Sequence, residues 1–458
     1  MAAAALVVYA VALAAGGLAV WRRPAYAVYA FVVGLALHNA VMAGLFALGV
    51  EGTPLSLVAA WKEVLLAVAL GRVTRDAAIA RRLPFRPALV DALALVFAAL
   101  VLLYAVLPQS TLGGEADATT ILYALRHDLA CVAAYFLGRS IELPPLRRLV
   151  LATAATVALL GVAEAYTVPI DRWEDADVPA YFHEQLGFVH HGPRGLPENF
   201  VFNTGDENDL LRRAVSTFLS PLGTAYLLVV ALCLWAVRPR SAWPLAAIVA
   251  VGLLFTFTRA ALLALAGAFL VLASVHRRWW PVAAAAGTLA VGVVWTQVYP
   301  SIAPETTWSQ ADLRYQREQA AKLGSTPGET VALDEPSIRS HLRALREGAE
   351  TVVEHPQGYG LGNAGATALR RGVPLKAGES TYTELGVETG LLGALAFIAW
   401  SLVVLWGLVR SRAAGIAAAF AAVLALGVQT DVLGTPWLAY VVWILAGAAL
   451  TAGGREVR

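Results

Sequence analysis

The chain has 458 residues, of which 59% are hydrophobic and 14% are charged, and its formal net charge is +2. With a mean hydropathy of +0.65, this composition excludes a soluble globular domain and indicates a polytopic membrane protein. The basic residues form no patch, so no nucleic-acid partner is expected. Cys131 and Cys233 lie in apolar stretches and are expected to be small core residues, because they match neither a disulfide framework nor a metal site.

Apolar stretches of bilayer length recur along the chain, so the predicted fold is an all-α polytopic membrane protein. The best count is about 13 transmembrane helices, within a range of about 12–14. In the first stretch the positive charge follows the apolar run, which favours a retained helix over a cleaved signal peptide. The expected spans are 2–21, 25–49, 54–72, 87–107, 119–138, 149–166, 214–237, 242–257, 260–276, 279–298, 385–409, 413–430 and 434–452.

Arginine is unevenly distributed between the two sets of short connections. Every second connection is rich in arginine, whereas the alternate ones contain almost no basic residue and include Glu51, Glu115 and Asp431. By the positive-inside rule, the N-terminus is expected outside and the C-terminus in the cytoplasm. The arginines assigned to the cytoplasmic side are Arg22, Arg23, Arg72, Arg75, Arg81, Arg82, Arg86, Arg139, Arg147, Arg148, Arg238, Arg240, Arg277, Arg278, Arg410, Arg412, Arg455 and Arg458.

Two long segments interrupt the spans, and both are expected on the outer side. They contain mixed charges, Trp, Tyr, Pro and Gly, which favours folded segments over disordered ones. Any chemistry there takes place away from cytoplasmic ATP and sugar nucleotides, so its substrate must already be activated and is expected to be membrane-anchored. The predicted organisation is N-terminal transmembrane helices in 1–166, a first outer loop in 167–213, central transmembrane helices in 214–298, a large outer loop with the site residues in 299–384, and C-terminal transmembrane helices in 385–458.

Charged residues also occur inside two expected spans, where they are costly. Lys62 and Glu63 in one span, and Arg126 and Asp128 in another, lie on the order of 10 Å below the outer surface at 1.5 Å per residue. One interpretation is that they form structural ion pairs between helices. The other is a polar cavity that opens to the outside, and the two interpretations are compatible.

Arginines on the outer side are candidates for binding an anion. Arg213 precedes a span, Arg259 lies in an outer turn, and Arg339 shares a helix face with Arg343 and Arg346. The guanidinium group binds phosphate oxygens in pairs and stays charged in an apolar setting. The alternative for each is an arginine whose head group extends to the membrane edge. The opposite face of the predicted helix carries an apolar stripe of Ile338, Leu342, Leu345, Ala349 and Val352.

The stretch 355–393 combines a glycine-rich loop with acidic residues at the start of a span. The loop sequence HPQGYGLGN is expected to bring backbone close to another segment. Glu379 follows it, and Tyr382, Glu384 and Glu388 then enter the span. The alternatives are an ordinary external loop and, for Glu384 and Glu388, favourable placement at a helix N-terminus.

Several of these segments resemble the O-antigen polymerase and O-antigen ligase family of bacterial envelope proteins. The resemblance is carried by RAVSTFLSPLGTAY from Arg213, FTRAALLALAG around Arg259, Arg339 with HPQGYGLGN downstream, and ESTYTELGVETGLLG from Glu379. It implies a membrane-embedded glycosyltransferase that uses an oligosaccharide on undecaprenyl diphosphate at the outer face of the bacterial cytoplasmic (inner) membrane. It also implies that no nucleotide sugar, cofactor or metal is required.

The resemblance assigns roles to individual residues. The diphosphate-binding arginines fall on Arg259 and Arg339, with Arg213 as a further candidate. Glu379 stands where the ligases carry a histidine, which favours the polymerase branch and makes Glu379 the expected general base. Further candidates for cavity or sugar contacts are Lys62, Arg126, Asp128, Arg343, Tyr382 and Glu384.

The expected function is therefore a polymerase that transfers lipid-linked oligosaccharide units onto an acceptor glycan, with inversion at the anomeric carbon and without a metal. One alternative is a ligase that transfers the glycan to lipid A core or to protein, and a second is a transporter of lipid-linked oligosaccharide. The charges within the spans gather in the outer half, which favours chemistry at one face over transport. The expected partners are the lipid-linked donor, the acceptor glycan, membrane lipid and other envelope-polysaccharide assembly proteins.

Overall fold

The fold is described from a computed structural model that covers residues 2–203, 210–323 and 336–453. Within these residues, nine helical segments are long and apolar enough to cross a membrane, and four further apolar helices are shorter. The all-α polytopic class is confirmed, and the two sets together match the expected count of about 13.

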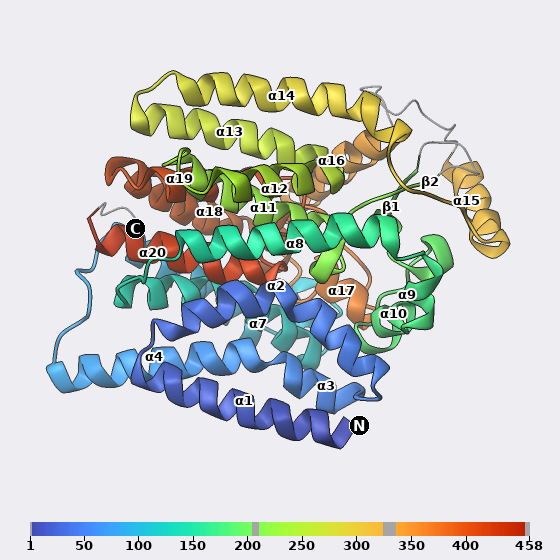
Figure 1. The fold of residues 1–458 in the computed structure, drawn as a ribbon. Helices are drawn as coiled ribbons and strands as arrows, with labels where there is room; N and C mark the ends of the chain where they lie inside the picture. The colour runs from blue at the N-terminus through green and yellow to red at the C-terminus, as the bar shows by residue number, and fades with distance from the viewer. Residues whose placement is uncertain (1, 204–209, 324–335, 454–458) are drawn as a thin grey trace.

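The long helices form a layer in which they run roughly side by side (Figure 1). They are α1 (Ala2–Arg22), α2 (Tyr26–Ala47), the consecutive pair α3 (Gly52–Ala59) and α4 (Trp61–Ala80), α5 (Leu89–Val106), α7 (Ala118–Ser140), α8 (Arg147–Thr167), α13 (Arg259–His276), α14 (Trp280–Val298) and α18 (Thr381–Arg410). The shorter apolar helices are α11 (Pro221–Ala236), α12 (Trp243–Phe255), α19 (Ala414–Leu426), and η6 (Leu438–Val442) continuing into α20 (Trp443–Thr451).

Helix α11 begins later than the expected span 214–237. The chain first forms the 3-10 turn η4 (Ser216–Phe218), and Leu219 then takes a left-handed conformation with φ +48°. The Ser220 hydroxyl accepts a hydrogen bond from the Gly223 N–H at 3.2 Å, and Pro221 occupies the first turn. A serine N-cap followed by proline defines a helix start, so residues 214–219 belong to the entry loop.

The described parts of the two long segments share a small sheet. Its strands are β1 (Val201–Asn203), β2 (Leu210–Arg212) and β3 (Glu305–Thr306), in the order β1-β2-β3 and antiparallel throughout. Because β2 comes from the first segment and β3 from the second, the sheet joins them. The remaining elements are α9 (Asp171–Asp175), α10 (Val178–Ala180), η1 (Tyr181–Gln185), η2 (Pro193–Gly195), η3 (Glu198–Phe200), η5 (Tyr299–Ser301), α15 (Gln310–Leu323), α16 (Pro336–Glu354) and α17 (Gly365–Arg371), while α6 (Gln109–Leu112) lies between α5 and α7.

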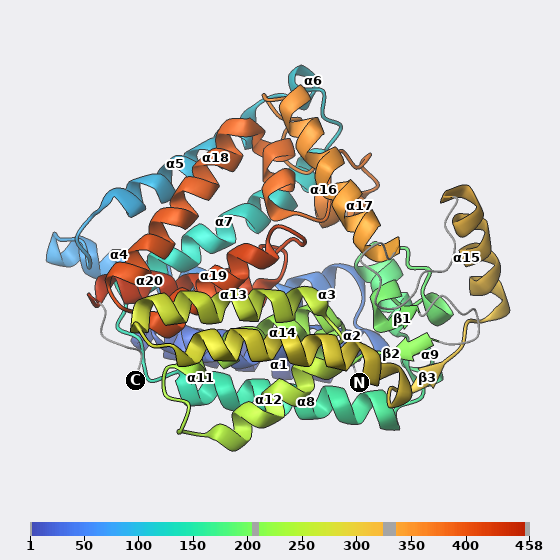
Figure 2. The same cartoon turned by 90° about the horizontal axis from the view of Figure 1, so that it is seen from above.

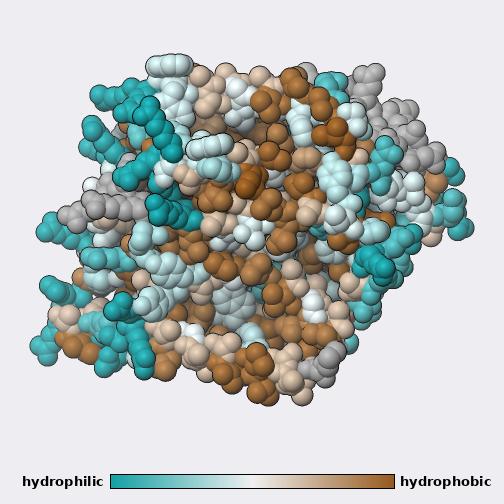
Figure 3. Space-filling model, viewed as in Figure 1, coloured by the Kyte–Doolittle hydropathy of each residue, from teal (hydrophilic) through white to brown (hydrophobic). Residues whose placement is uncertain are grey.

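The two ends of the helical layer carry different parts of the chain. The N-terminus and the sheet lie at one end, and the last described residues lie at the other (Figure 1). Termini at opposite ends are what an odd number of spans requires. Hydrophilic residues gather at both ends, and hydrophobic residues cover the surface between them (Figure 3). Arg455 and Arg458, which contributed to the predicted orientation, lie outside the described residues.

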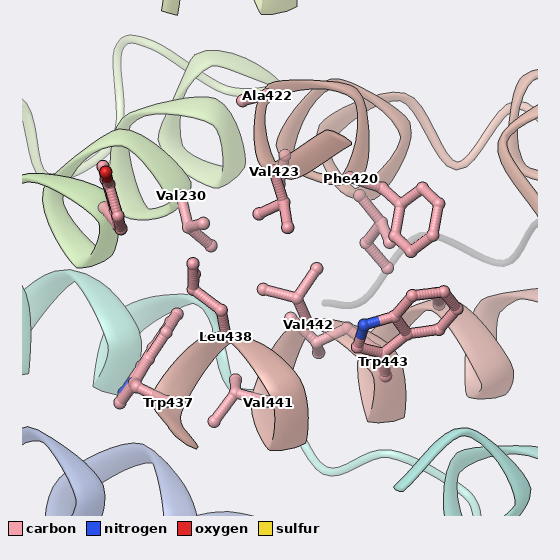
Figure 4. Packing of buried hydrophobic residues seen from close by; sticks show 14 of the residues in the cluster. Val230, Phe420, Ala422, Val423, Trp437, Leu438, Val441, Val442 and Trp443 are labelled. Carbon is pink, nitrogen blue, oxygen red and sulfur yellow. The ribbon is translucent and has the colours of Figure 1, made fainter. Parts of the chain in front are cut away.

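The core lies where α11, α19, η6 and α20 meet (Figure 4). Trp443 stacks on Trp400 of α18 with ring centroids 4.2 Å apart. Trp437 is 1% exposed, and its indole N–H donates to the Val32 carbonyl at 3.0 Å. A buried indole needs such a partner, so this bond fixes the start of the last helical run against α2. Figure 2 shows the same layer from above, with α5 beside α18 and α13 beside α14.

Helices α7 and α20 cross with their backbones in contact at two glycines. A Cβ atom at Gly138 would lie 2.8 Å from the Ile444 carbonyl carbon, and one at Gly447 would lie 3.0 Å from the Arg139 nitrogen. Small residues permit such close packing between membrane helices. The opposing atoms belong to backbone, which cannot rotate away.

Replacing Gly447 with Val is therefore expected to lower the free energy of unfolding by about 1–3 kcal/mol, as overpacking typically does. The measurement is unfolding of the purified protein in detergent. Gly267→Val is the matched control, because a Cβ atom at Gly267 of α13 meets nothing within 4 Å. Equal stability of the two variants would contradict the proposed close crossing.

Candidate functional site

Glu379 lies at the junction between the glycine-rich segment and α18, in a left-handed conformation with φ +68°. This conformation costs a non-glycine residue about 1–3 kcal/mol, and such residues concentrate at functional sites. The Glu379 side chain is 45% exposed, and its Oε2 lies 2.6 Å from Nδ1 of His341 in α16. Arg339, which is expected to bind the diphosphate, lies two residues before His341 in the same helix. The contact therefore places this helix beside Glu379, the expected general base.

The residues after Glu379 are held by the loop that follows α19. The Ser380 hydroxyl donates to the Gly427 carbonyl at 3.2 Å, and the Thr381 hydroxyl donates to the Thr430 carbonyl at 3.0 Å. The Thr381 hydroxyl also accepts from the Val432 N–H at 2.9 Å. These buried bonds fix the start of α18, so the Glu379 backbone has a rigid support.

The glycine-rich loop passes close to other segments, as its sequence indicates. A Cβ atom at Gly360 would lie 2.6 Å from Nε2 of Gln109, and one at Gly365 would overlap the Glu384 carboxylate. The Gly362 N–H donates to Glu388 at 2.8 Å. The glycines therefore allow the loop to cover the first two turns of α18.

A small pocket lies beside this loop, lined by residues of α7, α17, α18 and the loop after α19. His127 of α7 forms its centre, with Nδ1 2.8 Å from Asp128 and Nε2 2.8 Å from Asp431. Glu384 and Glu388 line the same pocket. Carboxylates around a histidine can bind sugar hydroxyls, and among the described residues no group of His, Cys, Asp and Glu is arranged to hold a metal ion.

Asp431 lies in the loop between α19 and η6, and its environment contains opposing effects. Burial alone would raise the pKa of Asp431. The nearby charge of His127, the hydrogen bond with His127 and the N–H groups of Gly434 and Leu433 outweigh burial and lower this pKa. Asp431 is therefore a carboxylate at neutral pH.

Positive side chains of α4 and α7 meet at Glu63. Glu63 Oε1 is 3.6 Å from Lys62 Nζ and 3.5 Å from Arg126 Nε, so Glu63 contacts both cations. Asp128 is instead bonded to His127. Of the ion pairs expected between these two helices, the pair of Arg126 with Glu63 is therefore present. Asp128 instead lines the pocket.

Arg213 and Arg259 lie together at the start of α13. The three nitrogens of the Arg213 guanidinium donate to the Thr256 carbonyl at 2.8 Å, the Asn199 carbonyl at 3.1 Å and the Thr258 hydroxyl at 2.9 Å. Burial lowers the pKa of Arg213 to about 10. Arg213 therefore holds the turn that precedes Arg259, whose guanidinium carbon lies 5.4 Å from the centre of the Phe202 ring.

The remaining candidates lie on α16 and α18. Arg339 and Arg343 lie on the exposed surface of α16, which packs against α18. Tyr382 points to α19, where its hydroxyl donates to the Leu424 carbonyl at 2.7 Å. The apolar stripe of α16 is buried only in part, because Val352 is 8% exposed whereas Leu342 is 62% exposed.

A comparison with known protein families gives one match. Residues 244–398 match the family model described as O-antigen ligase. This match supports the resemblance of the chain to the O-antigen polymerase and ligase family. The matched range of this family contains Arg259, Arg339 and Glu379, whereas Arg213 and Lys62 lie before it. Among curated proteins, no match to the chain is found.

Three residues of this region were not among the site residues predicted from the sequence, namely His127, Asp431 and His341. His127 stands beside Asp128 in the chain, and Asp431 served only as an acidic residue of an outer connection. His341 lies in the arginine-bearing helix, and its helical position alone does not show that it faces Glu379. The available signal was the rarity of charged and histidine residues within membrane spans, which marks them as functional candidates.

Proposed function

We propose that the protein is a polymerase that joins oligosaccharide units carried on undecaprenyl diphosphate. The reaction takes place at the outer face of the bacterial cytoplasmic membrane, with the N-terminus outside. The observation that carries the proposal is the 2.6 Å contact between Glu379 and His341, formed next to the helix of Arg339. The family ligases have a histidine at the Glu379 position, and here an imidazole from α16 accompanies the carboxylate.

The chemistry is a single displacement. The acceptor hydroxyl oxygen forms a bond to the anomeric carbon of the donor while the bond from that carbon to the diphosphate oxygen breaks. The bonding pair leaves with the diphosphate, and the hydroxyl proton passes to the Glu379 carboxylate. The products are the lengthened glycan, with inverted anomeric configuration, and free undecaprenyl diphosphate.

Arg259 and Arg339 are proposed to stabilise the departing diphosphate. Negative charge grows on the leaving oxygen in the transition state, and guanidinium groups already in place stabilise it without reorganisation, an effect worth about 3–4 kcal/mol per donor. Arg213 then acts as a positioning residue for Arg259, since its own donors are bonded to Thr256, Asn199 and Thr258.

A ligase is the second candidate, because the matched family model is described as O-antigen ligase. The two functions differ in the acceptor. A polymerase uses a second lipid-linked oligosaccharide, whereas a ligase transfers the glycan to lipid A core or to protein.

The deciding experiment gives the purified protein a lipid-linked oligosaccharide alone. For a polymerase, we expect the lipid-linked glycan to lengthen, measured by mass spectrometry of the extracted lipid. Transfer that starts only when lipid A core or an acceptor protein is added would establish the ligase. A protein that moves intact lipid-linked oligosaccharide across vesicles without glycan transfer would overturn both.

A further inference from the structure

The loop that holds the start of α18 is connected to α7 through Asp431. This residue lies between α19 and η6, and its Oδ2 is 2.8 Å from Nε2 of His127 in α7. The other oxygen, Oδ1, accepts hydrogen bonds from the N–H groups of Leu433 at 3.0 Å and Gly434 at 2.9 Å. One carboxylate therefore both folds the loop and joins it to α7.

The residues on either side of Asp431 are the ones that bind Thr381 in α18. The Thr381 hydroxyl donates to the Thr430 carbonyl at 3.0 Å and accepts from the Val432 N–H at 2.9 Å. Both bonds come from the immediate neighbours of Asp431 in the chain. A shift of Asp431 would therefore move the two groups that hold Thr381.

Thr381 in turn lies two residues after Glu379, the proposed general base. The Glu379 backbone has φ +68°, a conformation that a non-glycine residue keeps only where its surroundings impose it. Ser380, the residue between them, is buried, and its hydroxyl donates to the Gly427 carbonyl of the same loop at 3.2 Å. A continuous series of hydrogen bonds and short backbone segments thus runs from His127 to Glu379.

His127 can hold the loop because both of its ring nitrogens face carboxylates. Nδ1 lies 2.8 Å from Oδ1 of Asp128, the next residue in α7, and Nε2 faces Asp431. An ionised carboxylate only accepts hydrogen bonds, and Asp431 is ionised at neutral pH, so Nε2 carries a proton. The side chains of His127 and Asp431 are 21% and 14% exposed, so water competes little for this bond.

We propose that His127 and Asp431 are positioning residues for Glu379. They hold the loop 427–434, which fixes Thr381 and thereby the backbone of the proposed base. The inference rests on the proposed function, because it takes Glu379 as the base. A base must lie within hydrogen-bond reach of the proton that it removes, and a displacement of about 1 Å can lower the rate about 10²-fold. Loss of the contact should therefore lower kcat and leave donor binding unchanged.

Two substitutions at His127 separate its two contacts. Glutamine extends as far as the histidine Nε2 and can still donate an N–H to Asp431, whereas asparagine reaches only as far as Nδ1 and keeps the contact with Asp128 alone. We expect His127→Asn to lower kcat about 10²-fold and His127→Gln to lower it less than about 10-fold. The measurement is glycan transfer by the full-length protein from a lipid-linked oligosaccharide, with the acceptor that supports transfer. Equal losses in the two variants would overturn the proposal.

Double variants test whether the effect passes through Glu379. In the Glu379→Gln background the carboxylate is already absent, so adding His127→Asn should lower the residual rate no further. Thr381→Val removes the hydroxyl that joins α18 to the loop, and its effect should not add to that of His127→Asn. A further loss of about 10²-fold in either double variant would mean that His127 does not act through Thr381 and Glu379, and the proposal would be wrong.

Thr389→Val is the matched control for Thr381→Val. Thr389 is also a buried threonine of α18, but its hydroxyl donates to the Leu385 carbonyl of the same helix at 2.6 Å. This variant should transfer at the wild-type rate. A loss equal to that of Thr381→Val would overturn the specific role of the loop.

Binding measurements separate positioning from acceptor recognition and from loss of the fold. Undecaprenyl diphosphate should bind His127→Asn as it binds wild type. A raised KM for the acceptor with an unchanged kcat would assign His127 to acceptor binding and overturn the positioning role. If His127→Asn does not bind undecaprenyl diphosphate, Asp431→Ala replaces it, with Asp431→Asn as the conservative partner, and the same difference in kcat is expected between them.

The outcomes distinguish this inference from the proposed function. If Glu379→Gln is slow while both His127 variants transfer at the wild-type rate, the assigned base remains and the positioning role is overturned. If Glu379→Gln transfers at the wild-type rate while His127→Asn is slow, both the assigned base and the positioning role are overturned.

Discussion

Replacing Glu379 with Gln is expected to lower the rate of glycan transfer by about 10²- to 10⁴-fold, the usual contribution of a positioned general base. The amide keeps the size of the side chain but cannot accept the hydroxyl proton. Because Glu379 is 45% exposed, its replacement should leave the fold intact. The measurement is the initial rate of transfer from a lipid-linked oligosaccharide, with binding of undecaprenyl diphosphate as the check on folding.

Glu350→Gln is the matched control, because Glu350 is also an exposed glutamate of this region and pairs with Arg346 one turn earlier in α16. It should transfer at the wild-type rate. Normal turnover of Glu379→Gln would remove Glu379 from the mechanism.

The contact with His341 permits a sharper experiment on the same pair. If the imidazole orients the carboxylate, His341→Gln should retain part of the activity, because an amide can still donate a hydrogen bond to Glu379. The exchange variant, Glu379→His combined with His341→Glu, should be more active than Glu379→His alone. If the exchange gives no recovery, the pair has no joint role, and Glu379 acts without His341.

Hydropathy and arginine placement were sufficient to predict the membrane helices, because a span needs little more than length and apolar composition. Thus 242–257 and 260–276 were predicted as separate helices although only Thr258 and Arg259 lie between them, and α12 and α13 are separate. The start of α11 was predicted too early, since an apolar entry loop has the same composition as a helix. Only the cap at Ser220 distinguishes the two.

The site was less predictable, because its contacts join residues far apart in the chain. His127 and Asp431 are separated by 304 positions, and neither the periodicity of α7 nor the loop sequence around Asp431 gives a sign of their pairing. Asp128 was predicted as a cavity contact from its depth in the membrane, and Glu384 as a sugar contact at the start of a span. Both line the pocket.

Arg139 provides a similar case, because the sequence indicated only a topological role for it. In the structure it is 4% exposed, and it forms a bidentate pair with Asp91, which is 3% exposed. Arg139 Nε lies 2.9 Å from Oδ1 of Asp91, and Nη2 lies 3.0 Å from Oδ2. The same guanidinium also donates to the Thr451 hydroxyl at 2.9 Å, so the pair connects α5, α7 and α20.

Replacing Asp91 with Ala is expected to lower the free energy of unfolding by about 3–5 kcal/mol, because it leaves a buried guanidinium without its counter-charge. The Tyr135 hydroxyl also loses its acceptor, at 2.8 Å in the intact protein. The measurement is equilibrium unfolding in detergent. Asp76→Ala provides the control, since Asp76 pairs with Arg72 at 2.7 Å on the surface and its loss should cost about 0.5 kcal/mol or less.

The double variant Asp91→Leu with Arg139→Leu identifies the cause of the loss. If the uncompensated charge is responsible, removing both partners should be less destabilising than removing Asp91 alone, because no charge then remains buried. If the double variant is the least stable of the series, the hydrogen bonds to Thr451 and to the Arg86 carbonyl dominate instead. A stability of Asp91→Ala equal to that of Asp76→Ala would mean that the guanidinium is hydrated and that the pair does not hold the three helices together.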